Sequence, residues 1–346
     1  MSKRNLLIIT LTAGLLLLTC TAWLLWQHRL YRTDNFRARD GEEHAYYIYP
    51  GTDADSLLSL LLADYDLRSP RSWQRHCRHL GYTAPAPGFY RFPPQMGSQP
   101  LLRRLIHGEQ TPVRLTFRNT VRTHAQLAGR LSRQLLLDSL DIQVRLDSAD
   151  YMQQFGLTPQ TAVCLFLPDT YEVWWTMTAD ELFARMNREY RRFWNDRRRA
   201  EADALGLTPA QVTTLASIVE SETNKQAEFP LIASLYLNRL RIGMLLQACP
   251  TAIYANGDFT LRRVLKRHTA IDSPYNTYRY PGLPPGPIRC TRALTIDSVL
   301  HAPATDYLYM CANPDFSGTH VFSSTYARHA ATARRYQQEL NRRKIR

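Results

Sequence analysis

Two glutamates stand two residues apart near the end of a predicted helix, and the chain after them is rich in groups that bind sugars. Glu220 and Glu222 lie in the stretch 215–254, which goes on to supply amide, hydroxyl and aromatic side chains. A carboxyl group at the border of an apolar face can have its pKa raised into the range that a general acid needs. The pattern therefore indicates acid–base chemistry on a carbohydrate.

The helix that must position both glutamates has a clear start. Thr208 and Gln211 form a capping-box pattern, and Pro209 occupies the first helical position. These signals predict a helix from about residue 209 to about residue 225.

The helical periodicity does not choose between the two acids. At 100° per residue, Glu222 projects near the centre of an apolar face and Glu220 near its edge. The alternative to a catalytic role is a structural ion pair, in which one of the glutamates pairs with Arg239 or Arg241. The apolar face itself comprises Val212, Leu215, Ala216 and Val219.

The residues after the glutamates form a candidate binding surface for a sugar. Amides and a hydroxyl offer hydrogen bonds, and tyrosines offer ring faces with a polar tip. The run GLPPGPI, residues 282–288, is predicted to be a stiff groove wall because its prolines restrict the backbone. Any one of these side chains taken alone fits a surface or core role better, so the prediction concerns the cluster. Its members are Asn238, Gln247, Thr251, Tyr254, Tyr275, Asn276 and Tyr278.

Five motifs in order over residues 215–288 resemble the catalytic core of the endolytic murein transglycosylases, the YceG-like family. They are IVE-x-ET, NRL-x-IGM-x-LQ, PT-x-IY, YNTY and GLPPGPI. The resemblance implies that Glu220, the first acid of IVE-x-ET, is the catalytic residue. Glu222 and Arg239 then become candidates for residues that position Glu220 without contacting the substrate themselves.

The resemblance also implies a reaction that needs one carboxyl group. Ordinary glycosidases use two, whereas a lytic transglycosylase uses the C6 hydroxyl of N-acetylmuramic acid as an internal nucleophile. Glu220 would protonate the oxygen of the bond between N-acetylmuramic acid and N-acetylglucosamine and then act as a base toward that hydroxyl. The products end in 1,6-anhydro-N-acetylmuramic acid, and such cuts in nascent strands terminate glycan elongation.

Three positions depart from the family pattern. Cys249 precedes Pro250 where Asp is common, so an acid there is absent. Val163 and Cys164 stand before a PDTY segment where Glu and Gly are common. A second acidic helper from either segment is therefore not expected.

The N-terminal stretch 6–26 carries no charge and is long enough for one bilayer crossing. We expect residues 1–30 to form a cytoplasmic tip and a transmembrane anchor. A cleaved signal peptide and a lipoprotein signal at Cys20 are the alternatives. Arginines follow the stretch as well as precede it, so placement of the remaining chain on the periplasmic side of the bacterial inner membrane rests on the resemblance.

The net charge of +13 indicates an anionic partner. Nucleic acid is the generic candidate, but anionic lipid headgroups and the carboxylates of peptidoglycan stem peptides fit the charge equally well. The expected partners are peptidoglycan strands, the lipid bilayer and peptidoglycan synthases, with no nucleic acid. The six cysteines show no CxxC spacing and no metal-ligand pattern, so neither a metal nor another cofactor is expected.

The rest of the chain predicts an α+β protein. Segments 46–62 and 113–135 both suggest a strand, a turn and a helix, similar to the LysM-like α/β module of this family, expected over residues 44–140. A mainly helical catalytic domain should follow over 141–346, with its core at 209–330. It includes a helix capped by Thr178 and Glu181, then a hairpin and helix over 308–329, where His320 and His329 are expected to be structural.

The sequence thus predicts a membrane-anchored lytic transglycosylase. A non-catalytic, membrane-anchored peptidoglycan-binding or scaffold protein of the cell-wall machinery is the main alternative. In that case Glu220 would be only an ion-pair partner. A membrane-tethered nucleic-acid binder, supported by charge alone, is a third hypothesis.

Overall fold

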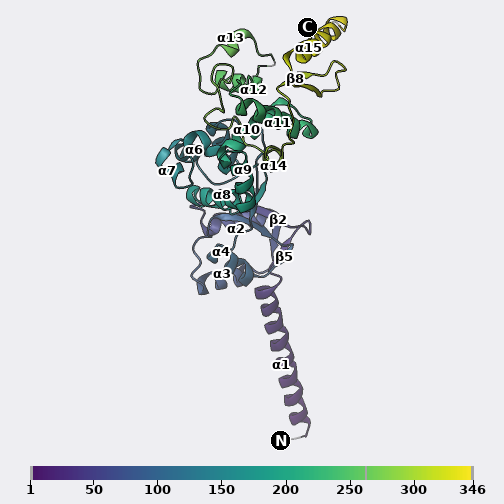
Figure 1. Cartoon of the computed structure of the whole chain (residues 1–346). Helices are drawn as coiled ribbons and strands as arrows, with labels where there is room; N and C mark the ends of the chain where they lie inside the picture. Colours follow the sequence, from purple (N-terminus) through teal and green to yellow (C-terminus); the bar gives the residue numbers. More distant parts are fainter. Residues whose placement is uncertain (1–2, 262, 344–346) are drawn as a thin grey trace. The chain divides into compact units, whose positions relative to one another are not determined.

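The computed structural model describes residues 3–261 and 263–343 (Figure 1). Its contacts divide the chain into two compact units. Unit 1 comprises residues 1–114 and 172–177, and unit 2 comprises 115–171 and 178–346. Residues 1–2 of the expected anchor, and residues 262 and 344–346 of the expected catalytic domain, lie outside the described residues. The architecture is mixed helix and sheet, as expected.

Unit 1 begins with the long helix α1 (Lys3–Arg32), which includes the predicted span. Residues 8–32 are apolar and long enough to cross a membrane, and the leucines and tryptophans between residues 11 and 26 are exposed. The last turn of α1 belongs to the folded unit, because Leu30 is fully buried and the ring of Tyr31 stacks on His76 at 4.1 Å. Helix α1 is thus longer than the uncharged stretch 6–26, and its last turn packs into the core of unit 1.

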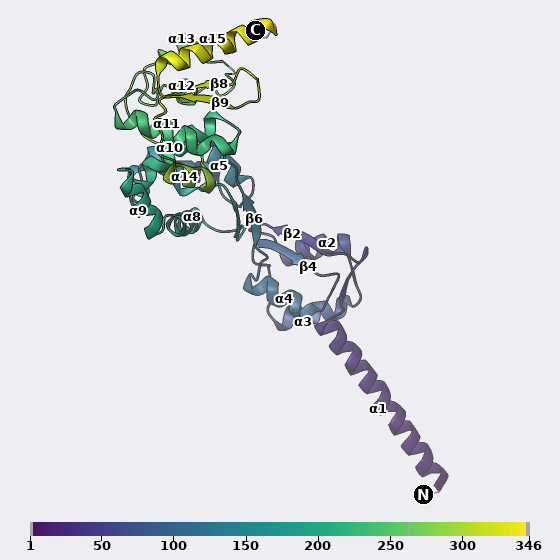
Figure 2. The same ribbon diagram turned by 45° about the vertical axis from the view of Figure 1, so that its right-hand side comes forward.

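Two small antiparallel sheets organise the rest of unit 1, and Figure 2 labels the strands β2 and β4 of one of them. In the two-stranded sheet, β2 pairs with β4 so that Tyr46 faces Tyr90 across the ladder. In the three-stranded sheet, β1 lies between β3 and β5. Helices α2, α3 and α4 contribute leucines and Trp73 to the shared core. The bounds are β1 Phe36–Ala38, β2 His44–Ile48, α2 Ala54–Asp64, β3 Tyr65–Leu67, α3 Pro70–His79, β4 Gly88–Phe92, β5 Gln95–Met96 and α4 Ser98–His107.

The two predicted strand–turn–helix segments both form, but they differ in their surroundings. The first is β2 followed by α2, within unit 1. The second is β6 (Val113–Thr116) followed by α5 (His124–Ser132). Strand β6 pairs with β7 (Thr170–Val173) rather than with the first sheet, and α5 belongs to unit 2. The boundary between the two contact units thus falls after residue 114, and the domain boundary expected near residue 140 stays a prediction.

Unit 2 is mainly helical, and α10 (Pro209–Glu222) lies at its centre. Helix α10 packs against α11, α12 and α14, and every residue from Val212 to Glu220 is buried. The residues of the expected apolar face are buried, and so are the polar residues between them, because neighbouring helices also cover the other sides of α10. The other helices are α6 Ser139–Asp147, α7 Ala149–Gln153, η1 Pro159–Leu165, α8 Ala179–Phe193, α9 Asp196–Ala204, η2 Gln226–Glu228, α11 Phe229–Arg241, α12 Cys249–Asn256, α13 Lys266–Thr269 and α14 Ala293–Leu300.

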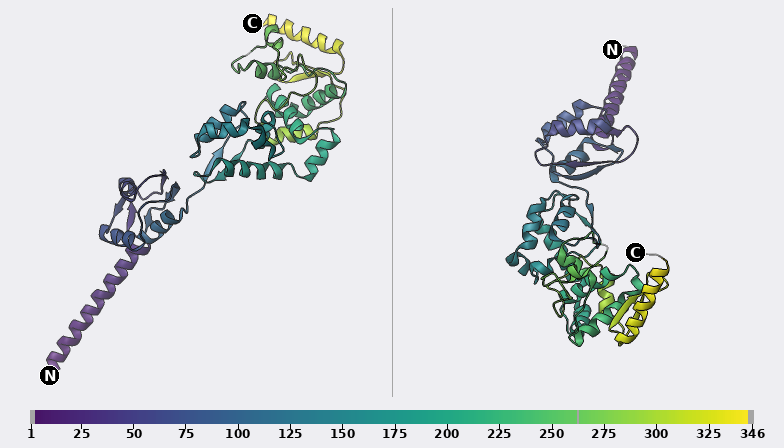
Figure 3. Two further views of the ribbon diagram at one scale, coloured as in Figure 1. Left: turned by 90° about the vertical axis from the view of Figure 1, so that its left-hand side faces the viewer. Right: turned by 90° about the horizontal axis from the view of Figure 1, so that it is seen from above.

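The predicted helix starts are confirmed in unit 2. Thr208 and Gln211 form the reciprocal capping box of α10, and Thr178 and Glu181 form that of α8. Helix α10 ends at Glu222 rather than near residue 225, because Thr223 is extended. The hairpin of β8 (Tyr309–Ala312) and β9 (His320–Ser323) is also as predicted, and α15 (Tyr326–Arg342) packs on it (Figure 3).

Candidate active site

Glu220 is a buried anion held by three donors. Its side chain is 1% exposed and forms an ion pair with the guanidinium of Arg292. Asn119 Nδ2 donates to Oε1 at 3.0 Å, and the backbone N–H of Arg292 donates to Oε2 at 3.2 Å. A buried carboxylate needs such partners, since an unpaired one is very costly. The ion-pair partner is therefore Arg292, and neither Arg239 nor Arg241 takes this role.

Arg292 belongs to a segment that α10 holds in place. The backbone N–H of Ile288 donates to Ser217 Oγ at 3.0 Å, and Arg289 Nε donates to the carbonyl of Asn119 at 2.5 Å. Glu220 thus ties residues 288–292 and the loop at Asn119 to the end of α10.

Glu222 lies in a different environment at the last residue of α10. It is partly exposed, and the hydroxyl of Tyr236 on α11 donates to its Oε1 at 2.7 Å. Burial raises the pKa of Glu222, and the Tyr236 hydrogen bond opposes that rise in part. Burial also raises the pKa of Tyr236 well above its usual value, so its hydroxyl stays a donor. The surroundings of Glu222 therefore favour the protonated carboxyl group more than bulk water does.

Glu222 opens into a cavity of about 340 Å³, which we call the Glu222 cavity. Gln247, Tyr278 and Cys249 line it from one side, and Met310 and His320 from the β8–β9 hairpin. A second cavity of about 400 Å³, lined by residues 221–225 and by the hairpin, also reaches Glu222. Volumes of this size suit a sugar-sized ligand. Glu220 lines neither cavity.

His320 lines both of these cavities, which sequence reasoning did not predict. Its Nδ1 lies 3.0 Å from Glu228 Oε2, and its backbone N–H donates to Glu228 Oε1 at 2.6 Å. Thr223 Oγ1 donates to the same carboxylate at 3.0 Å. Glu228 thereby fixes the orientation of the imidazole beside Glu222. His329, the other histidine expected to be structural, also lines the Glu222 cavity.

Three of the predicted site residues form hydrogen bonds within the protein and line neither of these two cavities. Asn238 donates to the carbonyls of Thr305 and Tyr307, and Asn276 is fully buried. The hydroxyl of Thr251 is buried between α12 and Thr277. Their polar groups are satisfied by the chain itself, and the predicted role of these three residues in substrate binding stays a prediction. Arg239 also lines the Glu222 cavity, but its guanidinium donates to backbone carbonyls of Leu246 and Leu308.

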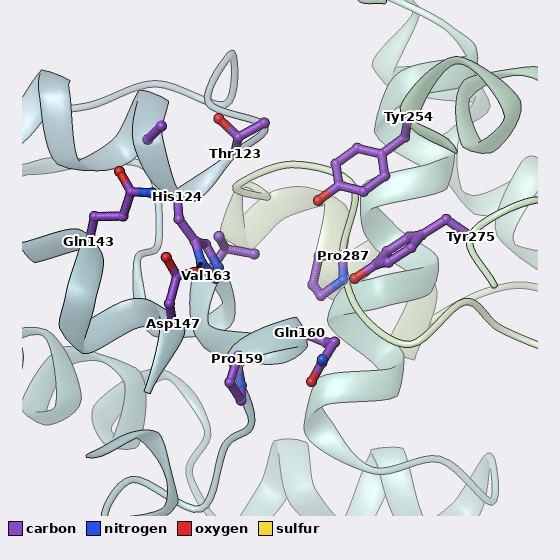
Figure 4. Close-up of a pocket in the computed structure, with 11 residues that line it drawn as sticks. Thr123, His124, Gln143, Asp147, Pro159, Gln160, Val163, Tyr254, Tyr275 and Pro287 are labelled. Atoms are coloured by element: carbon purple, nitrogen blue, oxygen red, sulfur yellow. Dashed lines mark hydrogen bonds and ion pairs between the residues drawn. The ribbon is translucent and has the colours of Figure 1, made fainter. Parts of the chain in front are cut away.

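Tyr254 and Tyr275 line a separate cavity of about 390 Å³, which we call the tyrosine cavity (Figure 4). Their ring centroids are 4.7 Å apart. The opposite wall carries His124, whose Nδ1 lies 2.6 Å from Asp147 Oδ1. Gly286, which precedes the lining residue Pro287, packs closely against η1: a Cβ there would overlap the carbonyl of Gln160. The second glycine of GLPPGPI is thus required for this close approach.

The positions that depart from the family pattern have different surroundings. Cys249 is exposed on α12, and its Sγ lies 3.1 Å from the hydroxyl of Tyr278. Val163 and Cys164 are buried in η1, where burial raises the pKa of the Cys164 thiol. Among residues 3–261 and 263–343, no three His, Cys, Asp or Glu side chains gather as metal ligands.

Comparison with known proteins assigns the chain to a family. The model of the YceG-like family matches residues 46–335, and the chain belongs to this family. It is 27% identical over 308 residues to the endolytic murein transglycosylase of Bacillus subtilis (strain 168), covering 84% of both chains. It is 26% identical over 272 residues to the endolytic murein transglycosylase of Streptococcus pneumoniae (strain D39), covering 69% of this chain and 48% of that one.

A solved structure supports the same fold. A YceG-like protein from Listeria monocytogenes superposes with a TM-score of 0.54 and 24% sequence identity. The match covers 84% of this chain and 99% of that one.

Proposed function

We propose that this protein is an endolytic lytic transglycosylase that cleaves peptidoglycan strands. Family membership and the relatives named endolytic murein transglycosylases support the reaction class. The observation that carries the chemistry is a partly buried carboxyl group, Glu222, facing a cavity of about 340 Å³. A tyrosine hydroxyl orients this carboxyl group.

We infer Glu222 as the general acid, because it lines both of the cavities at the end of α10 and Glu220 lines neither. A general acid must be protonated at the working pH and must reach the substrate. Burial raises the pKa of Glu222, and its side chain lines the cavity. The side chain of Glu220 is buried, and its oxygens accept hydrogen bonds from Asn119 and Arg292. The sequence-based assignment of catalysis to Glu220 is the competing proposal, and substitutions at the two positions decide between them.

In the proposed mechanism, Glu222 donates its proton to the glycosidic oxygen as the C1–O bond breaks. The C6 hydroxyl of N-acetylmuramic acid attacks C1, and its proton passes to the carboxylate of Glu222. One carboxyl group therefore serves twice, and no water is consumed. Holding the C6 hydroxyl in place supplies the nucleophile by proximity, and the acid–base role contributes about 10² to 10⁴ in rate.

The N-terminal part of the chain supports a membrane location for this reaction. Helix α1 has the length and apolar surface for a single-pass anchor. We place the two units on the periplasmic side, where nascent strands and their synthases lie. Two helices, α2 and α3, lie between the paired antiparallel strands β2 and β4, with the short strand β3 between the helices, and this arrangement supports a LysM-like, glycan-binding role for unit 1.

The test is the chemistry of the ends that the full-length protein produces. Purified peptidoglycan is digested in detergent, and the products are analysed by mass spectrometry. We expect 1,6-anhydro-N-acetylmuramic acid ends, and a loss of about 10² or more in the Glu222→Gln variant. Reducing ends would mean hydrolysis. Absence of any cleavage by the folded wild-type protein would favour the scaffold alternative, and full activity of Glu222→Gln would return the role to Glu220.

A further inference from the structure

We propose that the tyrosine cavity is a second glycan subsite, separate from the Glu222 cavity, that binds an uncharged N-acetylated sugar of the same strand. This inference rests on the proposed function, because it assumes that the substrate is a glycan strand. The cavity measures about 390 Å³, which lies within the range of small-ligand sites.

One wall of the cavity is an aromatic surface. Tyr254 from α12 and Tyr275 from the following loop lie with their ring centroids 4.7 Å apart and their planes at 43° (Figure 4). Both side chains are partly exposed, and both line the cavity. Aromatic rings supply a large apolar contact together with a polar tip. The pair therefore offers a surface on which the C–H face of a sugar ring can pack.

The polar groups around the cavity are free to bind a ligand. Among the described residues, the hydroxyls of Tyr254 and Tyr275 and the side-chain amides of Gln143 and Gln160 have no hydrogen-bond partner in the chain. Burial raises the pKa values of both tyrosines, so their hydroxyls remain protonated donors. Two amides and two phenols can together satisfy the hydroxyl and acetamido groups of a sugar.

The charges around the cavity indicate a neutral ligand. The chain carries a net charge of +13, yet no lysine or arginine occurs among the described residues that line this cavity. Its one carboxylate, Asp147, is paired with His124 at 2.6 Å. A stem peptide carries carboxylates that would find no cationic partner in this cavity, whereas an uncharged N-acetylated sugar needs no cationic partner. The chemistry therefore favours the glycan backbone.

The same two segments build both cavities. Helix α12 contributes Cys249 to the Glu222 cavity and Tyr254 to the tyrosine cavity. The following loop contributes Tyr278 to the first and Tyr275 to the second. A sugar held by the tyrosines would thus fix the position of its strand relative to Glu222. The subsite therefore determines where the strand is cut.

The test measures binding of peptide-free glycan strands, prepared by amidase treatment, to the full-length protein in detergent. A Glu222→Gln background limits cleavage, and product analysis verifies that the strands stay intact. We expect Tyr254→Ala and Tyr275→Ala each to weaken Kd about tenfold, as for an aromatic contact residue. Gln143→Leu should weaken it about threefold to tenfold through loss of hydrogen bonds. Gln153→Leu, an exposed position outside the cavity, is the matched control.

Two results would overturn the subsite. One is an unchanged Kd in folded Tyr275→Ala and Gln143→Leu variants. The other is binding of a free stem peptide that these substitutions abolish, since the cavity would then recognise peptide. Failure of the proposed function looks different: wild-type protein would release no 1,6-anhydro ends, whatever the binding data show. In otherwise wild-type protein, the Tyr275→Ala and Gln143→Leu substitutions should also change the length distribution of the products, which a purely structural role would not do.

Discussion

Replacement of Glu220 by glutamine separates a structural anion from a catalytic acid. The amide keeps the size of the side chain, and its oxygen can still accept one hydrogen bond from Asn119 or Arg292. It removes the negative charge that neutralises the Arg292 guanidinium, and it places an NH₂ group where one donor now points. We therefore expect the main effect to be a loss of stability.

The size of that loss follows from burial. Removing one partner of a fully buried ion pair costs about 3–5 kcal/mol. Arg292 keeps 34% of its side-chain surface exposed, so water can solvate the unpaired guanidinium in part. Together with the retained hydrogen bond, this lowers the expected cost to about 2–3 kcal/mol. For a unit of this size, that corresponds to a decrease in Tm of about 4–12 °C.

The assay is thermal unfolding of the full-length protein, combined with strand cleavage at a temperature where both variants are folded. Glu339→Gln is the matched control, because Glu339 pairs with Arg342 on the exposed face of α15 and should cost under about 1 kcal/mol. Glu220→Gln should retain more cleavage than Glu222→Gln. A Glu220→Gln protein with wild-type Tm and cleavage reduced about 10²-fold or more would refute this reasoning and make Glu220 the general acid.

Three further outcomes follow from the same structure. Burial raises the pKa of Glu222, so kcat should fall as pH rises through a value above that of an ordinary glutamic acid, and Glu222→Gln should remove this limb of the pH–rate profile. Cys249→Ser should leave cleavage within a few fold, while Cys249→Asp should move that limb to higher pH, because a second carboxylate in the cavity disfavours ionisation of the first. Gly97→Ala should lower the Tm of full-length protein, since a Cβ there would overlap the backbone of Arg32; Gly14→Ala, with open space around it, should not.

Local signals in the sequence predicted the local structure well. The capping boxes of α8 and α10, the hairpin β8–β9 and the long apolar helix are all present, because each depends on residues close together in the chain. The predicted end of α10, near residue 225, was less accurate, because no glycine or proline marks the end of the helix before Thr223.

The partners of the glutamates could not be predicted in the same way. Asn119 lies 101 residues before Glu220 and Arg292 lies 72 residues after it, and neither stands in a recognisable motif. The predicted polar residues also divided among different roles. Asn276 satisfies backbone carbonyls of the chain, whereas Tyr275, its neighbour, faces a cavity. Adjacent residues in a loop point in different directions, and composition alone does not tell which one faces the ligand.

The junction between α1 and the core of unit 1 has a mechanical consequence. Leu30 is fully buried, Tyr31 stacks on His76, and Asp34 pairs with both Arg29 and Arg68. The helix therefore enters the folded unit without a flexible tether. With α1 in a bilayer, unit 1 would be held at a fixed height above the lipid surface and would turn with the helix. The distance between unit 1 and the bilayer would then be set by the length of α1. Each whole helical turn added to α1 would increase that distance by about 5.4 Å.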